Sequence, residues 1–182
     1  MKKATLLLLA ISIVNFGFSQ VYMDKKAKTH FLSKSEIEDI EATNKTSVVV
    51  MDAGKGNVQV QVQIKAFKFA SSFMEEHFNE NYMESEKFPF STFKGKINET
   101  VDYTKDGEVK VTCTGKLEMH GVSKDVTIPG TLKIKGNQIT LTADFKVKIA
   151  DYKIKVPSLY TKNIAEEIAV DVIAIMEPFK KP

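Results

Sequence analysis

The chain has no arginine, so all 26 of its basic residues are lysines. A lysine ammonium cannot make the planar two-point contacts that arginine makes with phosphate or carboxylate groups. The formal net charge is only +3, and Lys2 and Lys3 at the start supply two of those charges. Without arginine or a strongly basic surface, the sequence argues against a nucleic-acid-binding protein.

Cysteine is almost absent as well, since Cys113 is the single example in 182 residues. A lone cysteine excludes an internal disulfide framework. Cys113 has the same parity as Val111 and Leu117 in an alternating run, so we expect it to be a small buried hydrophobic residue. A reactive thiol would need an exposed, electropositive setting that this run does not offer.

Motifs for catalysis or metal binding are also missing from the sequence. The chain lacks a nucleophile elbow, a phosphate-binding loop and a dinucleotide fingerprint. Its three histidines, His30, His77 and His120, are too far apart for the short ligand spacing of zinc sites. We therefore expect no catalytic residues, no cofactor and no metal site, and we expect His30 and His120 to be structural or solvated.

The chain begins with its longest apolar run. Lys2 and Lys3 precede the apolar segment 4–16, and small residues follow at 17 and 19. This order is typical of a secretory signal peptide covering residues 1–19, with cleavage before Gln20. The alternative is a membrane anchor, but the run is short for a membrane span and no stop-transfer pattern follows. We expect residues 20–182 to form one exported domain, periplasmic or secreted, without a transmembrane segment.

Alternation of apolar and polar residues dominates the rest of the chain and predicts strands. The predicted strands are 29–33, 46–51, 58–64, 93–103, 109–119, 126–134, 139–149 and 168–176. Turn signals lie at 104–107, 120–124 and 135–138. The acidic run 35–44 is expected to lie outside the core.

These strands predict an all-β fold, an antiparallel lipocalin-like barrel of about eight strands. A parity change at Lys65 and the proline at Pro129 predict bends or edges in long strands, which favours a closed, coiled sheet. A barrel of this size has an interior that side chains fill or that one small ligand occupies. Small inward residues, among them Gly95, Gly115, Ala143 and Ala174, favour open space inside.

One helix is predicted among the strands, beginning at a capping box formed by Ser72 and Glu75. Met74, Phe78 and Tyr82 recur every four residues and place an apolar stripe on one side of that helix. A single helix with such a stripe must lie on a sheet or across the mouth of a barrel. We expect it to cap the barrel.

Ligand contacts are expected where this stripe and the inward strand positions face the barrel interior. The candidate ligand-binding residues are Met74, His77, Phe78, Tyr82, Phe93, Val111, Met119 and Phe145. Residues of this kind form core more often than binding sites, and it is the architecture that favours binding. The imidazole of His77 either donates to the polar end of a ligand or bonds to the backbone.

Two segments resemble the YceI-like family of bacterial periplasmic proteins. They are FMEEHFNENYMESEKFPFSTFKG at 73–95 and LEMHGVSKDV at 117–126. Phe88 stands where a tyrosine is common in the family. The resemblance implies a lipocalin-like barrel that encloses a long apolar ligand, such as a polyisoprenoid, a quinone-like molecule or another lipid, with no catalytic residues. True lipocalins are a different group with a tryptophan signature, and this chain has no tryptophan.

The leading hypothesis is therefore an exported protein that binds an apolar small molecule. One alternative is an envelope protein with a filled barrel core that has a structural role or binds a protein partner. Another is an enzyme that uses His77 or His120 as a base. The sequence leaves the oligomeric state open between a monomer and a homodimer.

Overall fold

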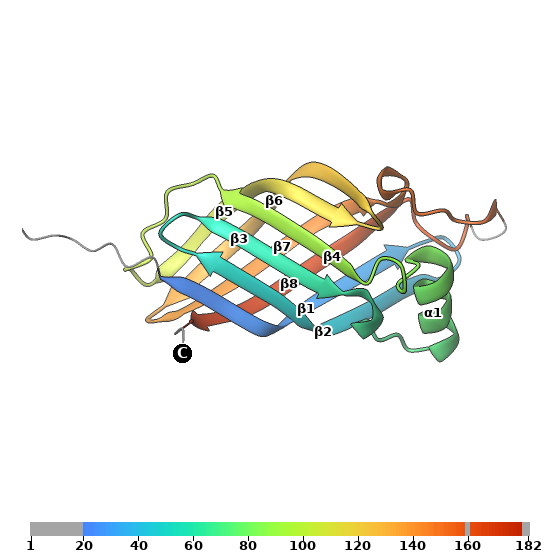
Figure 1. The fold of residues 1–182 in the computed structure, drawn as a ribbon, viewed down its shortest axis with the longest axis horizontal. Coiled ribbons are helices and arrows are strands. Elements are labelled where there is room, and N and C mark those ends of the chain that lie inside the picture. Colours follow the sequence, from blue (N-terminus) through green and yellow to red (C-terminus); the bar gives the residue numbers. More distant parts are fainter. Residues whose placement is uncertain (1–19, 159–160, 180–182) are drawn as a thin grey trace, which may run out of the picture.

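The computed structural model describes residues 20–158 and 161–179, so the expected signal peptide at 1–19 lies outside the described residues. Within them the chain forms a closed barrel crossed at one end by a short helix (Figure 1). The strands are β1 (Val21–Lys34), β2 (Asp39–Asp52), β3 (Asn57–Gln63), β4 (Phe90–Ile97), β5 (Gly107–Met119), β6 (Val122–Lys135), β7 (Gln138–Lys148) and β8 (Glu167–Pro178).

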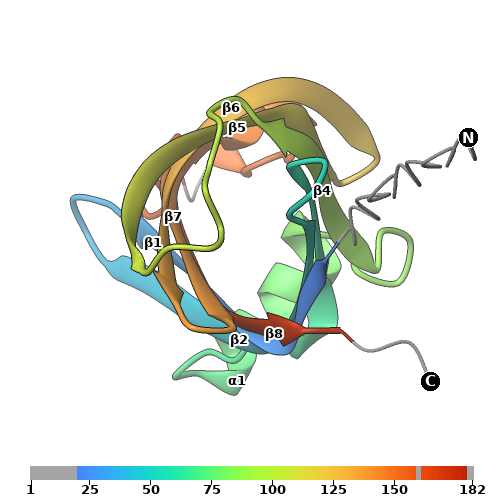
Figure 2. The same ribbon diagram turned by 90° about the vertical axis from the view of Figure 1, so that its left-hand side faces the viewer.

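The strands follow one another around the barrel in sequence order, and β8 pairs with β1 to close it (Figure 2). Every pairing is antiparallel. The expected all-β, eight-stranded antiparallel barrel is confirmed. The tight turns expected at 120–124 and 135–138 are also present, with Gly121 and Gly136 at positive φ.

The first two strands are longer than the sequence indicated. The candidate 29–33 is part of the 14-residue β1, and the acidic run 35–44 contributes the start of β2. The expectation that this run lies outside the core is wrong, because Ala42 and Asn44 are buried. Their inward side chains are small or polar, so charged outward neighbours such as Glu41 masked the alternation.

The bend expected at Lys65 is a 3-10 turn, η1 (Ile64–Ala66), which ends β3. Phe67 and Phe69 therefore lie outside the strand. Between these two phenylalanines, the backbone of Lys68 pairs with that of Thr43 in β2 at N–O distances of 2.9 and 3.1 Å. The chain thus crosses from the end of β3 to the first half of β2 and brings Phe67 and Phe69 to the barrel mouth.

Pro129 marks the end of a ladder, as expected for an edge. β6 pairs with β5 along its full length, but its ladder with β7 begins only at Gly130. Proline has no N–H to donate, so the ladder cannot continue through it. Beyond this point the apolar side chains of Ile128 and Val147 belong to one buried cluster that occupies this part of the barrel.

The connection from β4 to β5 is a loop at 98–106, so the predicted strand 93–103 is too long. The side chain of Glu99 explains the difference, because its carboxylate accepts a hydrogen bond from the amide of Thr112 at 2.7 Å. The Glu99 carboxylate thus takes the place of the backbone carbonyl that a continuing strand would offer to the Thr112 amide. The loop crosses the barrel end opposite the helix (Figure 2), where Val101 and Tyr103 pack on the main core.

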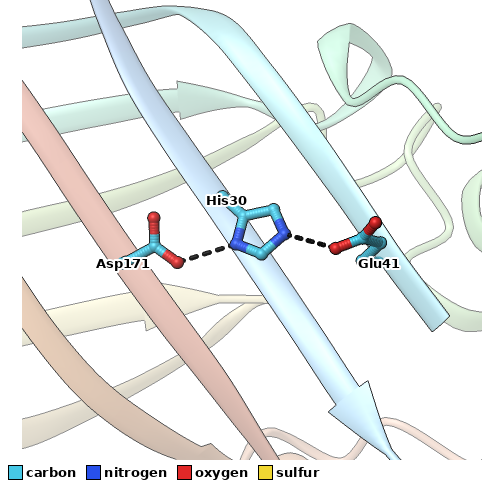
Figure 3. A network of polar contacts seen from close by, with 3 residues as sticks. All are labelled: His30, Glu41 and Asp171. Atoms are coloured by element: carbon cyan, nitrogen blue, oxygen red, sulfur yellow. Dashed lines mark hydrogen bonds and ion pairs between the residues drawn. The ribbon is translucent and has the colours of Figure 1, made fainter. Parts of the chain in front are cut away.

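His30 lies on the outer face of β1, in a polar network across three strands (Figure 3). Its Nδ1 lies 2.7 Å from Oδ1 of Asp171 on β8, and its Nε2 lies 3.1 Å from Oε2 of Glu41 on β2. The network spans the pairing of β8 with β1 that closes the barrel. This arrangement agrees with the structural role expected for His30.

Candidate ligand-binding site

The barrel encloses a cavity of about 190 Å³, here called the inner cavity. Apolar side chains make up nearly all of its lining, including Val60, Phe93, Leu141 and Val170. The lining contains no charged side chain among the residues that the structure describes. A cavity so largely apolar offers few polar partners to water and is suited to an apolar molecule.

A second cavity of about 250 Å³, here called the mouth chamber, lies beneath the helix at the open end. Six residues line both cavities: Phe31, Phe78, Met83, Ile149, Ile154 and Ile168. The two cavities therefore adjoin, and these six side chains form the boundary between the middle of the barrel and its mouth. Two apolar spaces that follow one another along the barrel suit a long chain-like molecule better than a compact one.

The helix that covers the mouth is α1 (Ser72–His77), continued by one π-helical turn, η2 (Phe78–Tyr82). Its N-cap is Ser71, whose hydroxyl accepts from the amide of Met74, so the predicted capping box at Ser72 is wrong by one residue. Glu75 does not reach back to the cap. Its carboxylate instead accepts from Lys68 Nζ and the amide of Phe69, and these bonds lower its pKa.

Four phenylalanines hold this helix against the barrel. Phe78 of η2 lies 5.5 Å from Phe31 of β1, 5.7 Å from Phe67 and 5.0 Å from Phe69, measured between ring centres. Phe31 also contacts Phe67 edge-to-face at 5.2 Å. Because aromatic pairs contribute roughly 0.5–1.5 kcal/mol each beyond their buried area, the cluster fixes the helix across the mouth.

All eight candidate site residues line one of the two cavities. The inner cavity contains Phe93, Val111, Met119 and Phe145, the mouth chamber contains Met74, His77 and Tyr82, and Phe78 lines both. Whether these side chains contact a ligand remains a prediction. Other lining residues were not singled out from the sequence, among them Phe31, Phe67, Met83 and Ile154. Ile154 and Met83 lie in irregular segments, where no periodicity could have identified them.

The small inward residues do not all create space, contrary to expectation. Ala143 lines the inner cavity, but Ala174 is fully buried in the main core. A Cβ atom added to Gly95 would lie 2.5 Å from the ring of Phe93, and one added to Gly115 would lie 2.2 Å from the carbonyl oxygen of Lys94. These glycines allow close packing of β4 on β5 and leave no cavity.

Two hydroxyl groups in the wall of the inner cavity, those of Thr29 and Ser91, have partners within the protein, and Ser91 donates to the carbonyl of Glu118 at 2.9 Å. The hydroxyl of Thr29 bonds to that of Ser47 at 2.8 Å, and Ser47 donates to Oδ1 of Asn44. The Asn44 amide donates to the carbonyl of Gln63 at 2.8 Å. Burial raises the pKa of Cys113 to about 11, so its thiol is neutral at physiological pH and adds to the apolar lining.

His120 forms a latch beside the mouth and lines neither cavity. Its Nε2 lies 2.7 Å from Oε2 of Glu84, and its Nδ1 lies 3.1 Å from the carbonyl oxygen of Tyr152. The ring also packs edge-to-face on Phe88 at 4.7 Å. Through these contacts His120, in the β5–β6 turn, connects the segment that follows the helix to the segment that follows β7. This agrees with its expected structural role.

Replacing His120 with asparagine is expected to destabilise the barrel by about 1–2 kcal/mol, since both hydrogen bonds of the ring and its packing on Phe88 are lost. Asparagine tolerates the positive φ of 51° at this position, so the change isolates the side chain. Urea unfolding would measure the loss, and hydrogen exchange should accelerate at 84–88 and 150–154. Lys124→Ala, which removes only an exposed 3.8 Å ion pair with Asp151, serves as the control and should cost under about 0.5 kcal/mol. An H120N variant as stable as this control would contradict the latch.

A closed antiparallel barrel with adjoining apolar cavities has the architecture of the lipocalin-like barrels, which enclose a small ligand. The family comparison agrees with this class. The chain belongs to the YceI-like family, because the model of the YceI-like domain matches residues 12–174. The resemblance seen in the segments at 73–95 and 117–126 is therefore confirmed.

Solved structures share the fold at low sequence identity. A polyisoprenoid binding domain from Saccharophagus degradans matches with a TM-score of 0.74 and 14% identity, over 87% of this chain and 98% of that one. BcnA of Burkholderia cenocepacia gives 0.69 and 20%, over 82% and 96%. The YCEI protein of Campylobacter jejuni gives 0.58 and 19%, over the whole of both chains. No curated protein matches this sequence.

None of the helices in residues 20–158 and 161–179 has the length and apolar character needed to cross a membrane. Nor do three or more histidine, cysteine, aspartate or glutamate side chains gather there in a group that could hold a metal ion.

Proposed function

We propose that the protein is an exported binding protein that encloses a long apolar molecule, a polyisoprenoid, quinone-like compound or other lipid, in the inner cavity and mouth chamber. The observation that carries this proposal is the pair of apolar cavities that adjoin at six shared apolar residues. The Saccharophagus degradans relative is described as a polyisoprenoid binding domain, which supports the same ligand class here.

The energetics favour a hydrocarbon chain in this space. Each methylene group moved from water into an apolar environment contributes roughly 0.8 kcal/mol. The hydroxyls of Thr29 and Ser91 in the wall already have hydrogen-bond partners, so an apolar guest leaves neither of them newly unsatisfied. We expect the tail of the ligand to lie in the inner cavity beside Phe93 and Phe145, and its polar end to lie in the mouth chamber beside His77.

The other hypotheses have less support. A filled barrel core would suit an envelope protein with a purely structural or partner-binding role, and the inner cavity argues against that reading. His120 is a poor candidate for a general base, because both of its ring nitrogens have partners and it lines neither cavity. His77 lies at the mouth, where its ring packs on Phe73 at 4.0 Å. We propose a role in binding for it.

Native mass spectrometry of protein expressed with its leader in a bacterial host, and purified without detergent, tests the proposal directly. We expect a stoichiometric apolar adduct, and solvent extraction followed by mass analysis would identify its lipid class. N-terminal mass determination on the same sample tests the expected cleavage before Gln20. A protein that has no adduct and takes up no added isoprenoid or quinone would overturn the proposed binding function.

A further inference from the structure

Charged side chains are distributed unevenly around the inner cavity and the mouth chamber. Neither cavity is lined by a lysine among the described residues, and the chain has no arginine. The mouth chamber is lined by one carboxylate, that of Glu38, and by one residue able to become positive, His77. The remaining polar lining residues, Ser33, Tyr82 and Asn163, are neutral groups.

The backbone of Glu38 is held by its own turn. The hydroxyl of Ser35 accepts from the amides of Ile37 and Glu38 and donates to the carbonyl of Glu38 at 2.7 Å. These bonds fix the path of the β1–β2 turn beside the mouth chamber. The exposed side chain of Glu38 therefore places a negative charge at the rim of the chamber.

No lysine offsets this charge within the lining of the mouth chamber. Lys34, Lys155 and Lys162 are adjacent in sequence to lining residues, but they are exposed and line neither cavity. Lys68, at the base of the helix, is paired with Glu75. A phosphate or diphosphate group drawn into the mouth chamber would thus lose part of its hydration without meeting a cation in the lining, and it would face the Glu38 carboxylate.

Resting on the binding function proposed above, we infer that the ligand of this protein has an uncharged head group, an alcohol or a quinone-type carbonyl, and that prenyl phosphates are excluded. Neutral oxygen atoms can exchange hydrogen bonds with His77, Asn163 or water at the mouth. The discrimination comes from the charge at the rim, since the apolar tail of both ligand types would be bound in the same way.

The test compares farnesol with farnesyl diphosphate, which carry the same tail. Each would displace N-phenyl-1-naphthylamine, a neutral apolar dye, from the purified barrel stripped of bound lipid. We expect farnesol to bind at least about tenfold more tightly than the diphosphate at low ionic strength. Equal affinities would overturn the inference and leave the proposed binding function intact. Binding of neither compound, with no uptake of longer isoprenoids or quinones, would overturn both.

A charge reversal at the rim makes the test sharper. Glu38→Lys should raise the affinity for farnesyl diphosphate about tenfold, leave that for farnesol within about twofold, and lose most of the gain at high salt. Glu36→Lys is the matched control, because Glu36 is exposed on the same turn and lines neither cavity. Equal gains in both variants would assign the effect to net charge alone and would overturn the assignment to the mouth chamber.

Discussion

Replacing Ala143 with phenylalanine is expected to reduce ligand affinity at least about 100-fold while the barrel stays folded. Ala143 lies on β7, and its methyl group lines the inner cavity. A cavity of roughly 150 Å³ is enough to hold one benzene molecule, so a phenyl ring would take most of the 190 Å³ available here. The ligand tail would then have no room in the barrel.

The control for this variant is the neighbouring residue on the same strand. Thr142 pairs with Ile173, which is 39% exposed, so its side chain points to the outer face. Thr142→Phe adds a ring of the same kind outside the barrel and should leave binding within about twofold of the wild type. Circular dichroism and urea unfolding would establish that both variants fold, and native mass spectrometry would measure lipid retention. Undiminished retention by A143F would place the ligand outside the inner cavity.

The parts of the fold predicted correctly were those in which apolar residues alternate with polar ones over a long run. β5 and β7 lie where 109–119 and 139–149 were predicted, because each presents bulky inward residues and polar outward ones. The start of β2 was missed for the opposite reason, since Ala42 and Asn44 are the buried residues there. Asn44 is stabilised by hydrogen bonds with Gln63, Thr46 and Ser47, which no alternation of hydrophobicity records.

The candidate site was predictable to the extent that it lies on regular elements. The stripe of Met74, Phe78 and Tyr82 predicted a helix facing the barrel mouth, and these residues do line the cavities. The aromatic cluster around Phe78 was not predictable, because Phe67 reaches it only after the chain leaves β3 and crosses to β2. The relative position of two irregular segments depends on such tertiary contacts and has no local signal in the sequence.

Glycine was the residue type most easily misinterpreted. An inward glycine leaves a gap only if the neighbouring backbone stays at its ordinary distance. At Gly95 and Gly115, which pair with each other, the ring of Phe93 or the backbone of β4 fills the place of the missing side chain. The same absence of a Cβ atom can therefore create either space or close contact. The inner cavity owes its volume to other positions, such as Ala143.

The close contact at Gly115 carries the largest expected effect on stability. Gly115→Ala should destabilise the protein by at least about 3 kcal/mol or prevent folding, because the added Cβ would lie 2.2 Å from the Lys94 carbonyl oxygen and 2.3 Å from the Gly95 Cα. Both atoms belong to the β4 backbone, which cannot rotate away as a side chain would. Urea unfolding monitored by circular dichroism would measure the change.

Gly107→Ala is the matched control, on the same strand as Gly115. A Cβ atom at Gly107 would have nothing within 4 Å. We expect this variant to remain within about 0.5 kcal/mol of the wild type, or to gain slightly from the reduced freedom of the unfolded chain. If G115A proved as stable as G107A, β4 and β5 would have to separate at little cost, and the contact between them would not constrain the barrel. A large difference between the two would establish that this contact fixes the wall against which the inner cavity is formed.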